Sequence, residues 1–235
     1  MKAEKEYQPM RSCPQLLQHR KLSRNTQGTD FFVGDIHGEF DQLMKRLSMV
    51  GFNRDCDRLI ATGDLIDRGP DSIKCLELLR KPWFYSVLGN HEAIFLKRDT
   101  DPNCRRLHQQ NGGSWANSLT NKEREHYQQL IQEHMSLAIT VVTKHLNVGV
   151  IHAMAPDDWQ ELEKPIDDWI PFLWSTQKYS ESQRKSSQTI SNIEFVISGH
   201  VGCSYVERGT NQVWIDTLLG SGKLTLAPIS QLLSA

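Results

Sequence analysis

Short apolar segments of this chain run three times into a glycine followed by a residue able to bind a metal ion. The three blocks are GDIHG (34–38), GDLIDRG (63–69) and GNHE (89–92). Each follows an apolar run that is typical of a buried strand. In open α/β sheets, functional side chains gather at the carboxyl ends of the strands. The pattern therefore predicts an α/β domain whose chemistry lies at one edge of a sheet.

Apolar spacing outlines the elements around these blocks. Strands are expected at residues 31–33, 58–62, 83–88, 138–142, 147–151, 195–197, 213–215 and 224–229. Helices are expected at residues 39–50, at residues 70–79 with Pro70 as the first helical residue, and at residues 123–137. The chain after Lys97 is expected to be irregular, with a turn at 111–113, and residues 156–189 to cross the active face.

The residue types in the blocks form a set of metal ligands. Asp35 and His37 are two residues apart after a strand, so both side chains can turn toward one ion. Mixed carboxylate and imidazole ligands suit Mn, Fe or Zn better than Ca or Mg. The expected ligands are Asp35, His37, Asp64, Asn90, His152 and His200. Asp64 is assigned as the shared ligand of two divalent ions, with Mn²⁺ the expected metal and Fe or Zn the alternatives.

Charge and proton transfer point to phosphate chemistry. Two divalent ions with Asp35, Asp64 and a bridging hydroxide leave a positive pocket that suits a phosphate dianion. Metal pairs about 3.5–4 Å apart generate hydroxide near neutral pH and stabilise in-line displacement at phosphorus. Arg68 offers a planar fork for phosphate oxygens. His91 is expected to protonate the leaving oxygen as general acid, and Asp67 to pair with His91 and keep it protonated.

The three ordered blocks, with the later His152 and His200, resemble the phosphoprotein phosphatase (PPP) family of serine/threonine phosphatases. The short chain and the segment NGGSW (111–115) make it most similar to the compact bacterial and phage members. The resemblance runs from about residue 31 to about residue 226. It implies a calcineurin-like metallophosphoesterase fold, an α/β architecture with a central β-sandwich flanked by helices.

The resemblance also implies what the chain does. Members of the family dephosphorylate phosphoserine and phosphothreonine in proteins, so a phosphorylated protein is the expected substrate, with phosphotyrosine as a further candidate. The implied roles agree with those assigned from the residues: Asp35, His37 and Asp64 on one ion; Asp64, Asn90, His152 and His200 on the other; His91 as general acid, Asp67 as its partner and Arg68 on phosphate.

One segment departs from the family pattern. Family members carry a second phosphate-binding arginine shortly after a Leu-Trp or Ile-Trp pair, but Thr176 occupies that place after Leu173-Trp174. Lys178 or Arg184 is the candidate substitute, and a lysine binds as a point charge rather than a fork. Phosphate binding is therefore expected to be weaker than in a member with both arginines.

Length and composition limit the other classes of function. The 235 residues allow one sizeable domain, here residues 28–235, preceded by a polar tail or edge segment at residues 1–27. A net charge of −1 indicates no nucleic-acid partner, and no apolar run approaches the ~18 residues that span a bilayer. The five cysteines show no C-x-x-C pair, which favours reduced thiols in the cytoplasm. No feature specifies an oligomeric state.

Several polar and aromatic residues are assigned structural roles. Glu92 is expected to hold its loop through hydrogen bonds, and Trp115 to serve packing. The histidines outside the blocks are expected on the surface or on helix faces, namely His19, His108, His126, His134 and His145.

Two alternative functions remain beside the protein phosphatase. A dinucleoside polyphosphate hydrolase shares the first block, but such enzymes tend to lack the acid at Asp67 and to carry Asp where Glu92 stands. A non-catalytic binding module on the same fold is the other alternative, and the complete set of ligands together with His91 argues against it.

Overall fold

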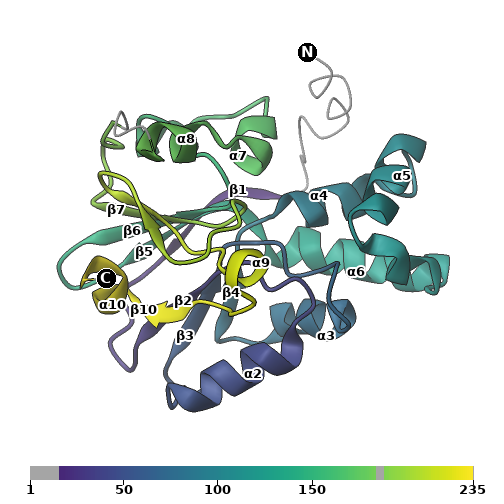
Figure 1. The fold of residues 1–235 in the computed structure, drawn as a ribbon, viewed down its shortest axis with the longest axis horizontal. Helices are drawn as coiled ribbons and strands as arrows, with labels where there is room; N and C mark the ends of the chain where they lie inside the picture. The colour runs from purple at the N-terminus through teal and green to yellow at the C-terminus, as the bar shows by residue number, and fades with distance from the viewer. Residues whose placement is uncertain (1–15, 184–187, 235) are drawn as a thin grey trace.

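Two β-sheets pack face to face with helices on their outer sides (Figure 1). This computed structural model describes residues 16–183 and 188–234. The predicted α/β class, with a central β-sandwich flanked by helices, is confirmed. No helix within the described ranges combines the length and the apolar character needed to cross a membrane.

The strands form one sheet of six and one of four. The larger sheet has the order β1 (Leu17–Leu22), β5 (Ser136–Val142), β6 (Asn147–Ile151), β7 (Phe195–Ser198), β9 (Gln212–Trp214) and β8 (Glu207–Arg208). The smaller has the order β10 (Leu226–Pro228), β2 (Asp30–Val33), β3 (Arg58–Ala61) and β4 (Phe84–Ser86). Strands β2, β3 and β4 are parallel, as are β6, β7 and β9. Each sheet therefore presents three parallel carboxyl ends.

Alternation along the strands fills two separate cores. Phe32 and Ile60 point between the sheets and join the apolar cluster built from β5, β6, β7 and β9. Their neighbours Phe31, Val33 and Leu59 face the helices and belong to the other cluster. Successive side chains of a strand point to opposite faces, so continuous apolar runs are what a strand buried on both faces requires.

The helices cover the outer faces and the edge where the parallel strands end. They are α2 (Phe40–Met49), α3 (Ser72–Glu77), α4 (Asn90–Lys97), α5 (Pro102–Gln110), α6 (Asn121–His134), α7 (Ile170–Trp174), α8 (Gln177–Gln183), α9 (Leu218–Ser221) and α10 (Ile229–Ser234). Short 3₁₀ turns are η2 (Leu78–Arg80), η3 (Gly113–Asn117) and η4 (Trp159–Glu163). Helix α6 begins with a capping box in which Thr120 and Glu123 exchange hydrogen bonds.

Three local expectations are wrong. Pro70 is not the first helical residue, because α3 begins at Ser72 after the N-cap Asp71. The helix expected to reach residue 137 ends at His134, since pairing of β5 with β1 and β6 draws the following apolar residues into a strand. The chain after Lys97 is not irregular. It forms α5, with Pro102 in the first turn and Asp101 accepting a bond from the Asn103 N–H at 2.8 Å.

The segment at residues 1–27 contains a strand among its described residues. Strand β1 pairs in parallel with β5 and lies at the edge of the larger sheet. Its register places Leu17 opposite Ser136 and Leu22 opposite Val141.

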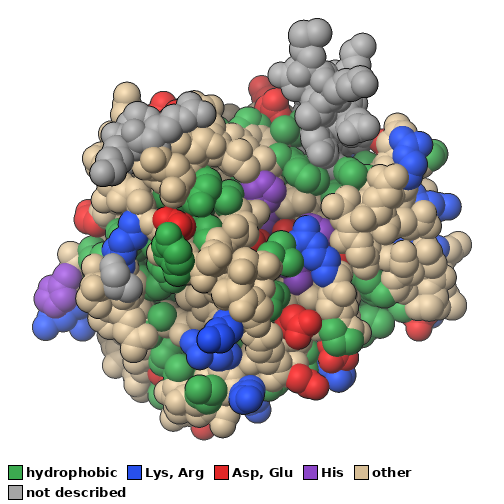
Figure 2. All heavy atoms as spheres, viewed as in Figure 1, with side chains coloured by type: hydrophobic (Ala, Val, Ile, Leu, Met, Phe, Trp, Pro, Cys, Tyr) green, Lys and Arg blue, Asp and Glu red, His purple; other side chains and the backbone are tan. Residues whose placement is uncertain are grey.

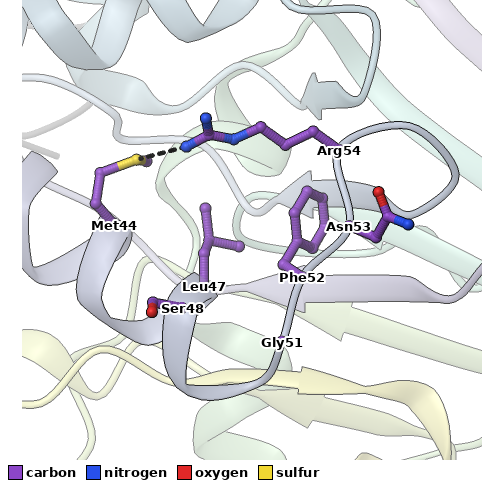
Figure 3. A pocket seen from close by; sticks show the side chains of 7 residues that line it. All are labelled: Met44, Leu47, Ser48, Gly51, Phe52, Asn53 and Arg54. Carbon is purple, nitrogen blue, oxygen red and sulfur yellow. Dashed lines mark hydrogen bonds between the residues drawn. The ribbon is translucent and has the colours of Figure 1, made fainter.

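A surface pocket lies where α2 ends and the chain turns toward β3 (Figure 3). Met44 and Leu47 of the helix and Phe52 and Arg54 of the loop line it, and Arg54 points its guanidinium at the Met44 sulfur, 3.7 Å away. The pocket sits at the amino end of β3, opposite the edge that carries the predicted ligands.

Candidate metal centre

The six predicted ligands come together where the parallel strands of both sheets end. Asp35, Asp64 and Asn90 follow β2, β3 and β4 of the smaller sheet, and His152 and His200 follow β6 and β7 of the larger. Figure 2 shows histidine, acidic and basic side chains gathered near the centre of this face. The seam between the two layers is therefore the candidate site.

The loops at this edge hold a strained backbone. Five of the six described non-glycine residues with a left-handed φ lie here: His37 at 44°, Asp64 at 48°, Asp67 at 73°, Arg68 at 68° and His200 at 65°. Each such conformation costs on the order of 1–3 kcal/mol and persists only where the surroundings enforce it. Strain of this kind concentrates at functional sites, and here it coincides with predicted site residues.

Glu92 enforces part of this conformation. Its buried carboxylate accepts backbone N–H bonds from Asp64 at 3.0 Å, Leu65 at 2.8 Å, Ile66 at 3.2 Å and Gly89 at 3.0 Å. The predicted structural role of Glu92 is confirmed. The same carboxylate ties the loop after β3 to the first turn of α4, which begins at Asn90.

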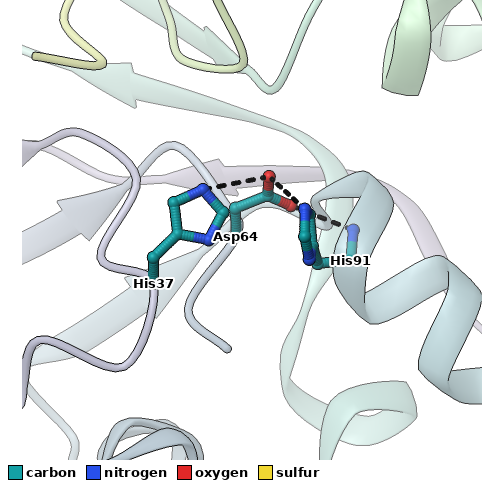
Figure 4. Close-up of side chains that lie close together, drawn as sticks. All are labelled: His37, Asp64 and His91. Carbon is teal, nitrogen blue, oxygen red and sulfur yellow. Dashed lines mark hydrogen bonds and ion pairs between the residues drawn. The ribbon is translucent and has the colours of Figure 1, made fainter. Parts of the chain in front are cut away.

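Asp64 lies at the centre of the cluster. Its Oδ2 is 3.8 Å from Nε2 of His37, 3.8 Å from Nε2 of His91 and 3.6 Å from Nε2 of His152. Figure 4 shows His37 and His91 on either side of this carboxylate. These separations exceed a hydrogen bond and match groups that converge on a common cation. Two overlapping groups share Asp64: one with His37 and His91, the other with His152 and His200.

In the second group of side chains, Asn90 lies next to His152 and His200. Its Oδ1 is 2.9 Å from Nε2 of His152 and 3.1 Å from Nδ1 of His200. Ligands at right angles, each about 2.1 Å from one ion, lie about 3.0 Å apart. Nδ1 of His152 faces the Thr62 carbonyl at 2.7 Å, so Nδ1 donates its proton there and Nε2 keeps a lone pair for the metal. These donors fit a divalent cation.

Carbonyl partners fix the tautomers of the other two imidazoles. Nδ1 of His37 lies 3.1 Å from the Ile66 carbonyl and donates its proton there, which leaves the lone pair on Nε2. Nε2 of His200 lies 3.1 Å from the Trp174 carbonyl, which leaves Nδ1. Burial lowers the pKa of His37 to about 4 and that of His200 to about 4. Both rings are therefore neutral near pH 7, as metal ligands must be.

Buried carboxylates are in excess around Asp35. Asp35 accepts a bond from the Thr62 hydroxyl at 2.8 Å and one from the His200 N–H at 2.9 Å. Asp216, 1% exposed, lies against the Asp35 carboxyl group, and no N–H group within the described residues donates to its oxygens. Burial and the charges of Asp216 and Asp64 raise the pKa of Asp35 well above its usual value. Buried carboxylates in this number require a compensating cation, which again fits divalent metals.

His91 differs from the other imidazoles. Its Nδ1 is 2.7 Å from Oδ2 of Asp67, and both side chains are buried. Burial alone would lower the pKa of His91, but the charge of Asp64 and the bond and charge of Asp67 raise it above the usual value. Burial would raise the pKa of Asp67, but the bonds from His108 and His91 lower it. Both shifts favour a proton on the His91 ring and a negative charge on the Asp67 carboxylate.

The predicted phosphate contacts lie in different surroundings. Arg68 is exposed and its Nη1 is 2.5 Å from Nε2 of His37, so the guanidinium reaches the cluster. Lys178 is 8% exposed and its amine binds Asp157. The structure therefore places the Lys178 charge against a carboxylate and not among the ligand side chains. Thr176 is exposed, and Arg184 lies outside the described residues.

His108 lies on a helix, as expected, but it is not at the surface. This side chain is 0% exposed on α5 and approaches Asp67. His19 is a strand residue on β1 and not a helix residue, and its Nε2 bonds the Thr140 hydroxyl at 2.8 Å. Trp115 packs on Phe95, as expected, and also donates from its indole N–H to Asp67 at 2.7 Å.

Comparison with known families decides the class. The family model described as Calcineurin-like phosphoesterase matches residues 31–204. The chain belongs to this family. This calcineurin-like phosphoesterase is a hydrolase, as the blocks predicted, and the family implies divalent metal ions at the cluster of His and Asp side chains.

Full-length relatives of this calcineurin-like phosphoesterase are bacterial phosphatases. Serine/threonine-protein phosphatase 2 of Salmonella typhimurium is 35% identical over 208 residues, 86% of this chain and 93% of the relative. Serine/threonine-protein phosphatase 2 of Escherichia coli is 31% identical over 214 residues, 90% and 97% of the two chains. The symmetrical bis(5'-nucleosyl)-tetraphosphatase of Hamiltonella defensa is 44% identical over only 70 residues, 29% of this chain and 26% of that protein.

Solved structures share the fold. A provisionally assigned diadenosine tetraphosphatase superposes with a TM-score of 0.63 at 24% identity, covering 92% of this chain and 95% of that chain. A serine/threonine phosphatase from Saccharomyces cerevisiae superposes with a TM-score of 0.58 at 14% identity, covering 90% and 73%.

Asp216 is a site residue that the sequence reasoning missed. It follows β9, the third parallel strand of the larger sheet, two residues beyond Trp214. The same signal that marks Asp35 and Asp64, an apolar strand ending in an acid, is present here without the preceding glycine. Reading every strand end for acids would have found it.

Asp216 should make metal-free stability depend on pH. Burial and the charge of Asp64 raise the pKa of Asp216 to about 7, against 3.8 for the unperturbed group. The folded state then binds the proton more tightly, so this group lowers the free energy of unfolding as pH rises from about 4 to about 7. In EDTA-treated protein, Asp216→Asn should raise Tm by several degrees at pH 8 and by much less at pH 4.5. Equal gains at both pH values would contradict this assignment.

Proposed function

We propose that this chain is a metal-dependent phosphomonoesterase that dephosphorylates phosphoserine and phosphothreonine in proteins, with phosphotyrosine as a further candidate. The observation that carries the proposal is the convergence of carboxylate, amide and imidazole groups on one buried cluster, with His91 held by Asp67 at 2.7 Å. Burial lowers the pKa of His37, His152 and His200, whereas Asp64 and Asp67 raise that of His91. Three neutral ligands and one protonated acid are what phosphate ester hydrolysis at two metals requires.

This division among the buried imidazoles also assigns His91. Geometry alone groups His91 with His37 and Asp64 as a possible set of metal ligands. The bond to Asp67 and the raised pKa favour a proton on His91, so we assign His91 as general acid and complete the first ligand set with Asp35. The ligands are then those predicted: Asp35, His37, Asp64, Asn90, His152 and His200, with Asp64 shared.

The chain's own residues divide the remaining work. When bound, the metal pair supplies the nucleophile at neutral pH and stabilises the charge that develops on the phosphoryl group. Mn²⁺ is the metal that we propose, because imidazole and carboxylate ligands suit it. Arg68 binds phosphate oxygens with its guanidinium. His91 delivers the proton from Nε2 to the leaving oxygen, and Asp67 holds Nδ1 of that ring.

Relatives favour a protein substrate over a dinucleoside polyphosphate. In sequence, the serine/threonine phosphatases align with 84–90% of this chain, whereas the symmetrical bis(5'-nucleosyl)-tetraphosphatases align with 28–29% of it. The cytoplasm is the proposed compartment, since Cys56, Cys75, Cys104 and Cys203 are free thiols.

A substrate panel tests the proposal. Protein loaded with Mn²⁺ is assayed on phosphoserine, phosphothreonine and phosphotyrosine peptides and on diadenosine tetraphosphate. We expect kcat/KM for the phosphoserine or phosphothreonine peptides to exceed that for the dinucleotide by at least ~10-fold, about 1.4 kcal/mol of transition-state discrimination. A preference for diadenosine tetraphosphate would overturn the protein-phosphatase assignment. Inactivity on every substrate and on para-nitrophenyl phosphate would favour a binding module.

A further inference from the structure

The carboxylate that holds His91 receives contacts from a part of the chain outside the three blocks. Oδ2 of Asp67 accepts from Nδ1 of His91 at 2.7 Å. Oδ1 accepts from the Trp115 indole at 2.7 Å and lies 3.0 Å from Nε2 of His108. His108 belongs to α5 and Trp115 to η3, so both donors come from the segment after α4.

Arg98 specifies the tautomer of His108. Nη1 of Arg98 lies 3.4 Å from Nδ1 of His108, and a guanidinium can only donate. Nδ1 must therefore accept, and the ring proton lies on Nε2, toward Asp67. This N–H makes a bent contact with the carboxylate rather than a well-aligned hydrogen bond, and the described residues offer Nε2 no better acceptor. Nη2 of Arg98 binds Asn117 at 2.8 Å, which keeps the guanidinium in place.

The NGG turn lets this segment approach so closely. A Cβ at Gly113 would lie 2.3 Å from Cδ2 and Nε2 of His108, and Gly112 has a φ of 95°. A Cβ at Gly112 would lie 2.5 Å from the backbone nitrogen of Arg68. The turn therefore packs directly against His108 and Arg68, and only glycine fits there.

We propose that His108 is a positioning residue for the general acid, acting through Asp67. Together with Trp115, it occupies Oδ1 and fixes the rotation of the carboxylate, so that Oδ2 remains directed at Nδ1 of His91. His91 then keeps its Nε2 aimed at the leaving oxygen. This inference rests on the proposed function and adds Arg98, His108 and Trp115 to the supports of proton transfer.

The dependence on leaving group distinguishes this role from general structural support. A serine or threonine alkoxide leaves only with a proton, whereas para-nitrophenolate is a stable anion that leaves without one. Damage to proton delivery therefore affects phosphoserine turnover and spares para-nitrophenyl phosphate. A loss of folding or metal would affect both substrates equally.

The experiment compares three substitutions at one buried position in Mn²⁺-loaded protein. His108→Leu removes the donor. His108→Asn keeps a polar side chain too short to reach Oδ1, and His108→Gln can place an amide N–H near the position of Nε2. We expect kcat on a phosphoserine peptide to fall about 10-fold in His108→Leu and His108→Asn, which is a part of the ~10²–10⁴ that a general acid supplies. KM and para-nitrophenyl phosphate turnover should change less than about twofold, and His108→Gln should recover most of the loss.

His126→Leu is the matched control, because His126 also pairs with an arginine, Arg80, at 2.6 Å, but on the surface. Trp115→Phe removes the other donor to Oδ1 of Asp67. The loss of kcat in this variant should be non-additive with the loss in His108→Leu. Long-range ¹H–¹⁵N spectra of the wild-type protein should show the His108 proton on Nε2.

Three outcomes would overturn the inference while leaving the proposed function intact. They are parallel losses on both substrates in His108→Asn, no recovery in His108→Gln, and an Nδ1–H tautomer. An inactive wild-type protein would instead refute the proposed function, and the tautomer would still be measurable.

Discussion

Asp64→Asn should abolish both metal retention and catalysis. Oδ2 of Asp64 lies within 3.8 Å of three imidazole nitrogens and is the one carboxylate common to both candidate ligand groups. Asparagine keeps the Oδ1 acceptor for the His91 N–H, which is 3.0 Å away, but loses the negative charge. Metal content after gel filtration should fall from about two ions per chain to below one, and phosphatase activity to background.

The fold should survive this change. Burial opposes the charge of Asp64, but the charges of His152, His91 and His37 outweigh it and hold the pKa of Asp64 below its usual value, so loss of the carboxylate should lower Tm in EDTA at neutral pH without unfolding the protein. Asp158→Asn is the control, because Asp158 carries an exposed carboxylate that binds Asn192 at 2.8 Å on the surface. Full activity of Asp64→Asn at ordinary Mn²⁺ concentrations would refute the shared-ligand assignment.

His91→Asn should lower kcat for phosphoserine peptides by ~10²–10⁴ while metal content stays intact. The physical reason is that asparagine cannot release a proton to the leaving oxygen, whereas the metal ligands around it are untouched. Turnover of para-nitrophenyl phosphate should fall far less. Steady-state kinetics on both substrates, with metal analysis of the same preparation, measures the effect.

Loss of one metal ion from His91→Asn would give the opposite assignment. It would mean that His91 is a ligand, as its 3.8 Å distance to Oδ2 of Asp64 permits, and that the first group of side chains is the ligand set. His126→Asn serves as the control, since that histidine is exposed and contacts Arg80.

Residues within the three blocks were predictable because local spacing determines their placement. Asp35 and His37 follow the end of β2, and Asp64, Asp67 and Arg68 follow the end of β3. Because β2 and β3 are parallel neighbours, these residues are expected to lie close together. The roles of these residues as ligands, acid and phosphate contact remain proposals that the variants above test.

Residues outside the blocks were not predictable, for a physical reason. His108 sits on a polar helix whose composition resembles a surface element, and only the packing of α5 against α4 buries it beneath Asp67. Asp216 comes more than 120 residues after Asn90 and has no flanking motif. In both cases, contacts between distant segments decide the role, and local spacing carries no record of them.

The predicted end of one helix was wrong because strand pairing outweighed the local preference for a helix. The apolar residues after His134 continue a helical pattern, yet β1 and β6 provide hydrogen-bonding partners on both sides of β5. Pro102 and the capping residue Asp101 before it are a typical helix start. The helix that follows is so polar that the segment was instead predicted to be irregular.

The division of the site between the two layers has a consequence for how the enzyme matures. Asp35, His37, Asp64 and Asn90 extend from the smaller sheet, and His152, His200 and Asp216 from the larger. The smaller sheet alone holds the proposed ligands of the first ion, but the proposed ligands of the second ion come from both layers. A newly made chain therefore gains its complete two-metal centre only after the two layers have packed together. Before that, it is not expected to hydrolyse phosphate esters in the cell.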